Sequence, residues 1–301
     1  MISMWRLGGL SPFRLLTRVA RQAARDDLIG RSAELAYFFL FSVFPLLLFL
    51  TTLLGYLAQE NWGLRRELFL WVGNVSPSSD VTSLLRDTLR EITDARGGTK
   101  LGVGLALALV LASNGMEAVG RSLNVACGLN ESRPWWWRRA ISLGLVIVFG
   151  LLTVLALLLV FFGAWITEWL GEQLGFGPEM IVVWHWLQWT LVLLFVVLAF
   201  DLVYNFAPNL ARRHRVWLTP GSCVAVALWL VVSFGLRGYL AEFGVFTRTY
   251  GSLGAVIVLL LWFYLTAAAL LIGGEVNSEI SLASLGAGDR ADRSRVGRQR
   301  R

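Results

Sequence analysis

Long uninterrupted apolar runs are the feature that most restricts what this chain can fold into. The segments 140–165 and 253–272 are almost entirely aliphatic or aromatic. A membrane-spanning helix needs about 20 such residues, and soluble domains seldom contain runs of this length. With 56% hydrophobic residues and a mean hydropathy of +0.63, the 301-residue chain is predicted to be an all-α, polytopic membrane protein.

Six transmembrane helices are predicted. They cover residues 35–57, 100–119, 140–165, 182–206, 218–239 and 252–274. The chain then consists of an N-terminal segment (1–34), a six-helix transmembrane domain (35–280) and a basic tail (281–301). The tail is rich in glycine, aspartate and arginine, and we expect it to be disordered and close to anionic lipid headgroups.

The distribution of basic residues predicts the orientation of the chain. The N-terminal segment, the second and fourth connecting loops and the tail hold 19 of them, whereas the other loops hold 8. Because basic residues favour the cytoplasmic side, both termini are predicted to be cytoplasmic. The run Trp135, Trp136 and Trp137 beside two arginines agrees, since tryptophan anchors at the headgroup level. The same rule accounts for the net charge of +7 without a nucleic-acid partner.

The first external loop, residues 58–100, carries a helical pattern of its own. Apolar residues follow helical spacing over 62–75 and again over 81–94, which predicts two amphipathic helices. Three roles stay open for this loop: a lid on the bundle, a docking surface for a partner, or a pair of helices lying on the membrane.

Polar residues within the spans gather toward the predicted cytoplasmic side. Asn114, Glu117, Arg121 and Asn124 form one helical stripe, and Glu117 precedes Arg121 by four residues, the favourable order for a helical ion pair. Asp201, Asn205 and Glu275 lie at similar depth on other helices. Because a charge facing lipid costs several kcal/mol, we expect these seven residues to form one hydrated polar cluster.

The stretch GGEVNSE at 273–279 follows the most apolar helix and allows two interpretations. In one, Glu275 and Glu279 only mark where the helix reaches the headgroups, where acids cost little. In the other, Glu275 joins the polar cluster and pairs with an arginine. Arg121 is the first choice of partner, with Arg31 and Arg139 as alternatives.

Signatures of enzymes are missing from the sequence. It contains no phosphate-binding loop, no G-x-S-x-G and no C-x-x-C. His185 and His214 fall on opposite sides of the membrane in the predicted topology, so they cannot share a metal or serve one site. Cys127 and Cys223 are not expected to form a disulfide. We therefore expect no catalytic residues, no cofactor and no metal.

Four segments of the chain are similar to a known family. They are AELAYFFLFSVFPLLLFL (33–50), GRSLNVACGLNESRPWWWRR (120–139), PGSCVAVALWL (220–230) and YGSLGAVIVLLLWFYLTAAALLIGGEVNSE (250–279). They resemble the YihY/BrkB family of bacterial inner-membrane proteins, formerly labelled ribonuclease BN. Matching motif positions are Tyr37, Pro45, Arg121, Asn124, Arg133, Pro134, Pro220, Gly221, Tyr250, Gly251, Gly273 and Glu275. The resemblance implies a six-helix inner-membrane protein, and a role in envelope integrity or serum resistance, but no established activity.

Three functional hypotheses follow. The first is a transporter or flippase for a lipid or amphiphilic molecule, with the polar cluster as a site for anionic headgroups. The second is a non-catalytic scaffold or partner subunit of an envelope complex. The third is a ribonuclease or other hydrolase, which has the least support because metal-assisted hydrolysis needs grouped ligands. The sequence does not specify the oligomeric state.

Overall fold

The computed structural model describes residues 4–43, 98–174, 178–210, 217–242 and 252–299, and every regular element among them is helical. The elements are η1 (Met4–Gly9), α1 (Pro12–Arg25), α5 (Gly98–Ala126), α6 (Trp135–Leu174), α7 (Pro178–Phe206), α8 (Pro220–Glu242) and α10 (Ser252–Gln299), with a further helix over residues 28–43. Most of the first predicted span and nearly all of the external loop, with the two amphipathic helices predicted for it, lie outside the described residues.

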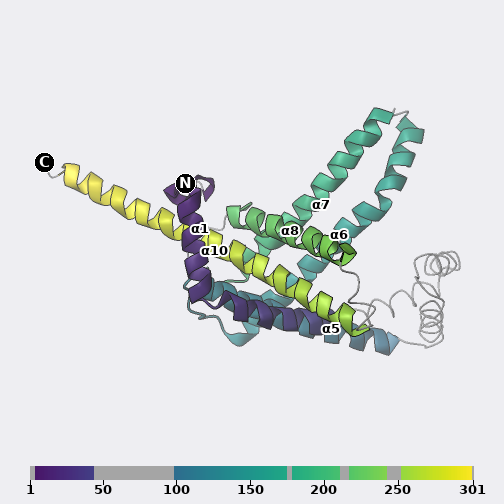
Figure 1. Ribbon diagram of the computed structural model, residues 1–301, viewed down its shortest axis with the longest axis horizontal. Coiled ribbons are helices and arrows are strands. Elements are labelled where there is room, and N and C mark those ends of the chain that lie inside the picture. Colours follow the sequence, from purple (N-terminus) through teal and green to yellow (C-terminus); the bar gives the residue numbers. More distant parts are fainter. Residues whose placement is uncertain (1–3, 44–97, 175–177, 211–216, 243–251, 300–301) are drawn as a thin grey trace. The chain divides into compact units, whose positions relative to one another are not determined.

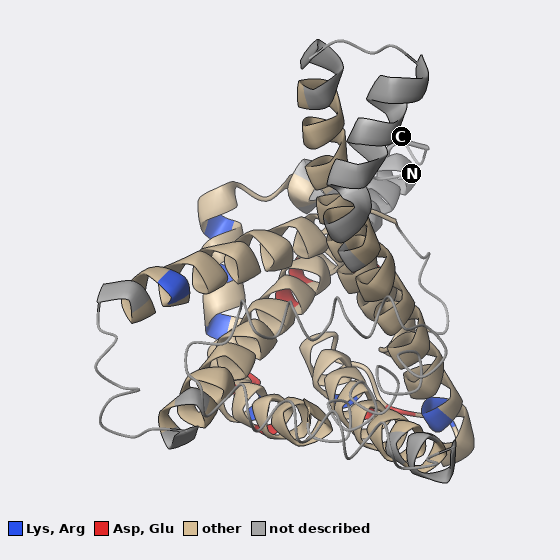
Figure 2. Ribbon diagram, turned by 90° about the vertical axis from the view of Figure 1, so that its right-hand side faces the viewer, with Lys and Arg blue, Asp and Glu red and all other residues tan. Residues whose placement is uncertain are grey.

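Four helices in the described part of the chain are long and apolar enough to cross a membrane. They are Trp135–Val160 in α6, Val182–Phe206 in α7, Pro220–Leu240 in α8 and Val256–Ser284 in α10, with mean hydropathies between 1.8 and 3.0. Figure 2 shows these helices almost free of charged residues over long stretches. They confirm the last four predicted spans. The second predicted span lies within α5, which is not among the four.

The chain divides into two compact units. One consists of Met1–Tyr37 and Ser113–Arg301, and the other of Phe38–Ala112. The described part of the second unit is helical throughout, over residues 38–43 and 98–112. All the polar groups discussed below belong to the first unit.

Within the first unit the long helices associate in pairs. α6 and α7 run antiparallel, and α8 packs along α10 (Figure 1). Large apolar side chains such as Ile147 and Leu151 on α6 and Trp186 on α7 point outward, each more than half exposed. In water such surfaces would be unfavourable, whereas lipid tails accept them.

Two glycines let α8 and α10 approach to backbone contact. A Cβ on Gly221 would overlap the Gly273 carbonyl oxygen, and one on Gly273 would overlap the Gly221 carbonyl and the Tyr204 hydroxyl. The backbone N–H of Gly221 donates to Asn277 Oδ1 at 2.9 Å. Small residues are what membrane helices need at such crossings, so these two positions fix the register of α8 against α10.

The N-terminal segment contributes an amphipathic helix that packs on α10. Ser11 caps the start of α1 by accepting from the Arg14 N–H at 3.4 Å, and proline follows at the first helical position. Leu15 and Val19 on its apolar face are buried against Val276 and Ile280. This contact fixes α1 beside the end of the last span.

Helix α10 continues well beyond its span. The sequence predicts disorder over 281–301, but α10 is helical to Gln299, so that prediction is wrong as far as this residue. The segment contains no proline, and its alanine, leucine and arginine residues are good helix formers. Propensity and continuity with the preceding span therefore outweigh the polar composition.

The end of α5 is closed by a glycine turn. Gly128 has a φ of +60°, its N–H donates to the Val125 carbonyl, and the Leu129 N–H donates to the Asn124 carbonyl. This pair of bonds is the Schellman arrangement, in which glycine supplies the left-handed residue. It directs the loop 127–134 back toward the end of α7.

Candidate functional site

The polar residues of the first unit collect where α5 and α7 end, where α6 and α8 begin, and at residues 273–281 of α10. We call this region the polar end. The predicted site residues all lie there, but they fall into separate groups. Glu117 and Arg121 line one pocket, and Asn124 bonds to Glu131 of its lining, whereas Asn114 bonds to Arg139 outside it. Asp201 and Asn205 form a second group, and Glu275 a third.

An ion-pair network occupies the C-terminal half of α5. Arg121 lies 3.0 Å from Glu34 and 3.9 Å from Glu117, which confirms the predicted i, i+4 pair. Glu117 also lies 3.7 Å from Arg138 at the start of α6. Arg121 and Glu34 are about half exposed. Long, partly exposed pairs of this kind contribute less than about 1 kcal/mol each, so the network can be rearranged at low cost.

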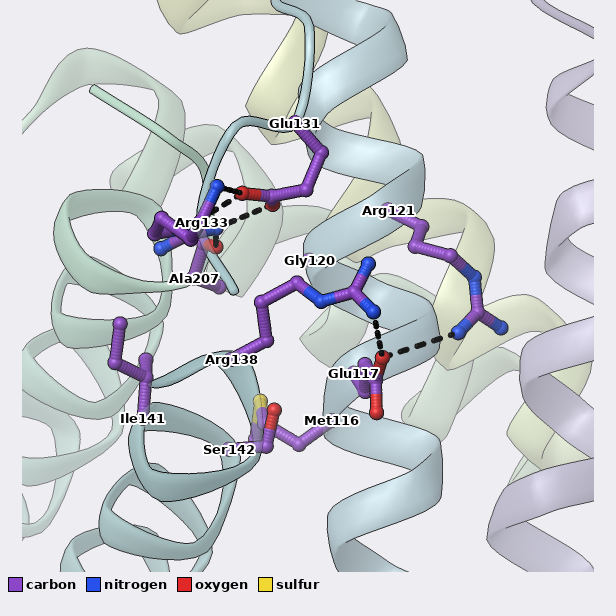
Figure 3. Close-up of a pocket in the computed structure, with 10 residues that line it drawn as sticks. All are labelled: Met116, Glu117, Gly120, Arg121, Glu131, Arg133, Arg138, Ile141, Ser142 and Ala207. Atoms are coloured by element: carbon purple, nitrogen blue, oxygen red, sulfur yellow. Dashed lines mark hydrogen bonds and ion pairs between the residues drawn. The ribbon is translucent and has the colours of Figure 1, made fainter. Parts of the chain in front are cut away.

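A small pocket lies between these side chains and the loop before α6 (Figure 3). Its polar lining comes from Glu117, Arg121, Glu131, Arg133, Arg138 and Ser142. About 10 Å³ is open to the centre of a water molecule, which is room for about one water. The Arg138 Nε is buried and finds no hydrogen-bond acceptor among the described residues. The pocket thus holds an unsatisfied guanidinium donor.

Asn114, the N-terminal residue of the predicted stripe, bonds to a residue outside the Glu117–Arg121 network. Its Oδ1 accepts a hydrogen bond from Arg139 Nη1. Arg139 follows Arg138 directly, so two adjacent arginines of α6 bind two residues of α5 one turn apart. These contacts hold the start of α6 against α5.

Glu131 and Arg133 form the strongest ion pair at the polar end. Arg133 donates from Nε and from its backbone N–H to Oε1, both at 2.9 Å, and from Nη2 to Oε2 at 2.8 Å. These bonds to Arg133, aided by one from Asn124, lower the pKa of Glu131 from 4.5 to about 2, and partial burial opposes them. A bidentate pair with extra donors is the geometry in which Arg and Glu bind most firmly.

The same arginine closes the end of α7. Arg133 Nη2 donates to the Ala207 carbonyl at 2.8 Å and Nη1 to that of Phe206 at 3.4 Å. The last carbonyls of a helix have no partners within the helix. Arg133 supplies donors and a positive charge there, which also suits the helix dipole.

Asn124 and Asn209 fasten the loop 127–134 to the chain after α7. Asn124 donates to Glu131 Oε2 at 2.9 Å and accepts from the Asn209 backbone N–H at 2.7 Å. Asn209 Nδ2 donates to the Asn130 carbonyl at 3.0 Å and to Ser132 Oγ at 2.9 Å. Asn124 therefore has a positioning role in this structure.

Asp201 serves a separate purpose at the start of α8. It is 1% exposed, and it accepts from the Leu218 N–H at 2.6 Å, the Thr219 N–H at 3.1 Å and the Thr219 hydroxyl at 2.9 Å. Asn205 Nδ2 donates to the Asp201 carbonyl at 2.9 Å. Leu218 has a φ of +57°, a conformation that side chains rarely adopt. The carboxylate thus stabilises a strained turn between α7 and α8.

Thr219 extends this group to α10. Its Oγ1 accepts from the Ser222 N–H at 3.2 Å, as an N-cap does, and from Asn277 Nδ2 at 2.9 Å. Tyr204, also on α7, donates its hydroxyl to the Leu270 carbonyl at 2.7 Å. Polar bonds therefore join three spans at one level of the polar end.

Among the described residues Glu275 forms no ion pair with an arginine, so the predicted pairing is wrong for this part of the chain. Glu275 is 2% exposed, and no described residue donates a hydrogen bond to its Oε2. Arg121 pairs with two other acids, and Arg31 donates through Nε to the Asp26 carbonyl at 2.8 Å. The rotation of α10 turns Glu275 toward Asp26, the residue after α1, instead of toward α5.

Glu279, expected to be the less important acid, is the one with a basic partner. It lies 3.7 Å from Arg18 of α1, and its side chain is 13% exposed. Neither acid of the GGEVNSE stretch is strongly exposed to solvent, since both are largely buried. That the helix reaches the headgroups at this point stays a prediction.

Comparison with protein families settles the classification. The family model described as virulence factor BrkB matches residues 19–297. The chain belongs to this family. With its four apolar helices, this BrkB-family chain is a multi-pass membrane protein.

Relatives of this BrkB-family chain carry two kinds of name. A ribonuclease-like protein, YfkH, of Bacillus subtilis is 36% identical over 249 residues, which are 83% of this chain and 88% of that protein. A UPF0761 membrane protein of Aeromonas salmonicida is 26% identical over 62% of this chain and 61% of its own length. One from Xanthomonas campestris is 40% identical over 27% of this chain but only 19% of that protein. No solved structure matches the chain.

Several residues of the polar end were not identified from the sequence. Glu131, Asn209, Asn277 and Asp26 lie outside the predicted spans, in a loop or beyond a helix end, where a search for intramembrane charges does not look. Arg133 and Pro134 are matched BrkB-family motif positions, and this resemblance was the signal for that loop. Within the described residues no three His, Cys, Asp or Glu side chains are grouped so as to hold a metal ion. His185 packs edge-on against Trp189, and His214 lies outside the described residues.

Proposed function

We propose that this chain is a transporter of flippase type for a lipid or amphiphilic molecule, and that the pocket at the polar end receives an anionic headgroup. The observation that supports this proposal is the sharing of Glu117 by two arginines. Arg121 and Arg138 approach it at 3.9 and 3.7 Å, distances too long for good hydrogen bonds. Arg138 also keeps an unsatisfied Nε donor.

A phosphate group would satisfy these donors better than Glu117 does. Guanidinium groups bind phosphate oxygens through two parallel hydrogen bonds, and phosphate has more acceptor sites than a carboxylate. The pocket adjoins the first turn of the α6 span, beside the exposed rings of Trp135 and Trp136. Tryptophan rings favour the headgroup level, which supports a headgroup-binding role for this pocket. The present cavity holds only about one water. A headgroup can therefore enter only if Glu117 breaks its ion pair with Arg121 or Arg138.

The proposal places the polar end on the cytoplasmic side of a bacterial inner membrane, with both termini there. The excess of basic residues on that side, 19 against 8, supports this orientation. The chain would then take up anionic lipids from the cytoplasmic leaflet, where such lipids are concentrated. A contribution to envelope integrity follows from lipid transfer of this kind.

A second function, that of a scaffold or partner subunit in an envelope complex, is favoured by the small volume of the pocket. The side chains around the described pocket leave room for one water and no substrate. A protein that only holds partners together needs no larger cavity. The name of the Bacillus relative raises a third function, RNA cleavage, but the described residues hold no group of three side chains that could bind a metal ion for it.

Reconstitution of the purified protein into liposomes tests the first proposal. A fluorescent lipid with an anionic phosphate headgroup should cross the bilayer, and a fluorescent neutral diacylglycerol analogue should show no protein-dependent acceleration. Arg121→Gln and Arg138→Gln should each reduce the rate for the anionic lipid at least tenfold. Arg14→Gln, which removes an exposed arginine of α1, should leave it unchanged. If the wild-type protein moves no lipid and instead purifies from membrane extracts with a stoichiometric protein partner, the scaffold function is favoured.

A further inference from the structure

The contact between α1 and α10 places two carboxyl groups together. Asp26 ends α1 as its C-cap, where its Oδ2 accepts from Gln22 Nε2 at 2.9 Å. Arg31 holds the Asp26 backbone carbonyl, not its carboxyl group. On α10, Glu275 faces this turn and lies next to the side chain of Asp26.

The Glu275 carboxyl is buried without a donor. The residue is 2% exposed, and its Oε2 is fully buried with no hydrogen-bond partner in the described part of the chain. An ionised carboxylate can only accept hydrogen bonds. Two ionised carboxylates therefore cannot bond to each other, and their mutual repulsion adds to the cost of burying the charge. The contact becomes a hydrogen bond only when one of the two oxygens carries a proton.

Several charged and titratable groups on the described elements that pack near this contact have other partners. From α1, Arg18 pairs with Glu279. From α5, Arg121 pairs with Glu34 and Glu117. From α7, Tyr204 donates to the Leu270 carbonyl. Asp201, also on α7, is held at the start of α8, beside the thiol of Cys223. None of them donates to Glu275 Oε2.

The geometry points to a proton-binding site, and we propose that Asp26 and Glu275 share one proton across the α1–α10 contact. Loss of this proton would leave the buried Glu275 carboxylate facing the partly buried, negatively charged Asp26 and would weaken the attachment of α1 to the end of the last span. Leu15 and Val19 pack against α10 next to this pair, so their contacts would loosen with it. The proposal rests on this contact alone and holds whether or not the chain transports lipids.

Infrared spectroscopy of the full-length protein in lipid vesicles tests the proposal. A protonated carboxylic acid has a C=O stretching band that shifts in D₂O and disappears on ionisation. The wild type should show such a band at neutral pH and lose it as the pH is raised. Glu275→Gln and Asp26→Asn should each abolish one proton equivalent of this band. Glu279→Gln, which removes a neighbouring acid that has an arginine partner, should leave the band intact.

Each outcome decides the question. If the wild type has no protonated carboxyl band at neutral pH, or if the band persists in both variants, the shared proton does not exist. The wild-type titration alone is sufficient if a variant fails to fold. Thermal unfolding adds a second readout, because Glu275→Gln carries a permanent donor and should unfold at a higher temperature than the wild type at alkaline pH. A third outcome is that the protonated carboxyl band is missing and the unfolding temperature depends on sodium concentration at fixed ionic strength. This result would replace the shared proton with a bound cation.

Discussion

Replacing Asp201 by alanine should be among the most damaging single changes at the polar end. The carboxylate is 1% exposed and accepts three hydrogen bonds, from the Leu218 N–H, the Thr219 N–H and the Thr219 hydroxyl. All three donors belong to the turn that starts α8. Without the carboxylate they face a cavity lined by protein and lack an acceptor.

The size of the effect follows from these three bonds. A buried donor left without a partner costs about 1–3 kcal/mol. Leu218, held at a φ of +57°, can relax and recover part of this cost. We therefore expect Asp201→Ala to lower the free energy of unfolding by about 3–5 kcal/mol, comparable to breaking a buried polar network. Asp201→Asn should cost about half as much, because one acceptor oxygen remains.

Unfolding in detergent micelles, followed by helix content against temperature and against denaturant, measures this difference. Glu279→Gln is the matched control, since it removes an acid whose single ion pair spans 3.7 Å to a half-exposed arginine. That change should cost less than about 1 kcal/mol. Thr219→Val should show strong coupling to Asp201→Ala in a double-mutant cycle, because the two residues share a hydrogen bond. If Asp201→Ala costs no more than the control, the carboxylate does not cap α8 as described.

Four further outcomes are expected. The pKa of Glu131 is lowered to about 2, so its ionised form stabilises the folded state by about 1–3 kcal/mol. This contribution should be complete above pH 4.5 and be lost as the pH falls toward 2. The unfolding curves of the wild type and Glu131→Gln should converge over that range. Gly273→Val should sharply reduce the yield of folded protein in membranes, because a side chain there overlaps α7 and α8, and a yield equal to the wild type would contradict the close crossing. An impermeant thiol reagent applied outside cells should label Ser79→Cys and spare Ser132→Cys; the reverse pattern would invert the topology. Purified protein should show no metal-dependent cleavage of RNA, and cleavage that a point mutant of this chain abolishes would restore the ribonuclease hypothesis.

The predicted stripe on α5 shows how far local sequence carries an argument. Glu117 and Arg121 are four residues apart on one helix, so their pairing depends only on helix geometry, and the structure contains it. The partners on other elements, Glu34 and Arg138, were not identified from the sequence. They depend on how α5 is rotated against its neighbours.

Asp201 and Glu275 illustrate the opposite case. Asp201 was expected to face protein or water rather than lipid, because a charge in hydrocarbon is costly, whereas two interpretations were open for Glu275. Both side chains are buried within the protein. Their actual partners are a turn seventeen residues on for Asp201 and the end of an N-terminal helix for Glu275. A search of the sequence for partners of opposite charge at equal membrane depth finds arginines. It does not find the backbone N–H groups that bind Asp201 or the second carboxyl group beside Glu275.

The sequence by itself determined the class of the protein, the four described spans and the family, because hydropathy and length are properties of each segment alone. Tertiary structure decided which polar groups meet. Successive residues of a helix point about 100° apart, so a small change in the rotation of α10 decides whether Glu275 faces an arginine of α5 or Asp26 beside α1. That rotation is fixed by the contact of Gly273 with Gly221 and by the apolar packing of α1, contacts between residues that are far apart in the chain.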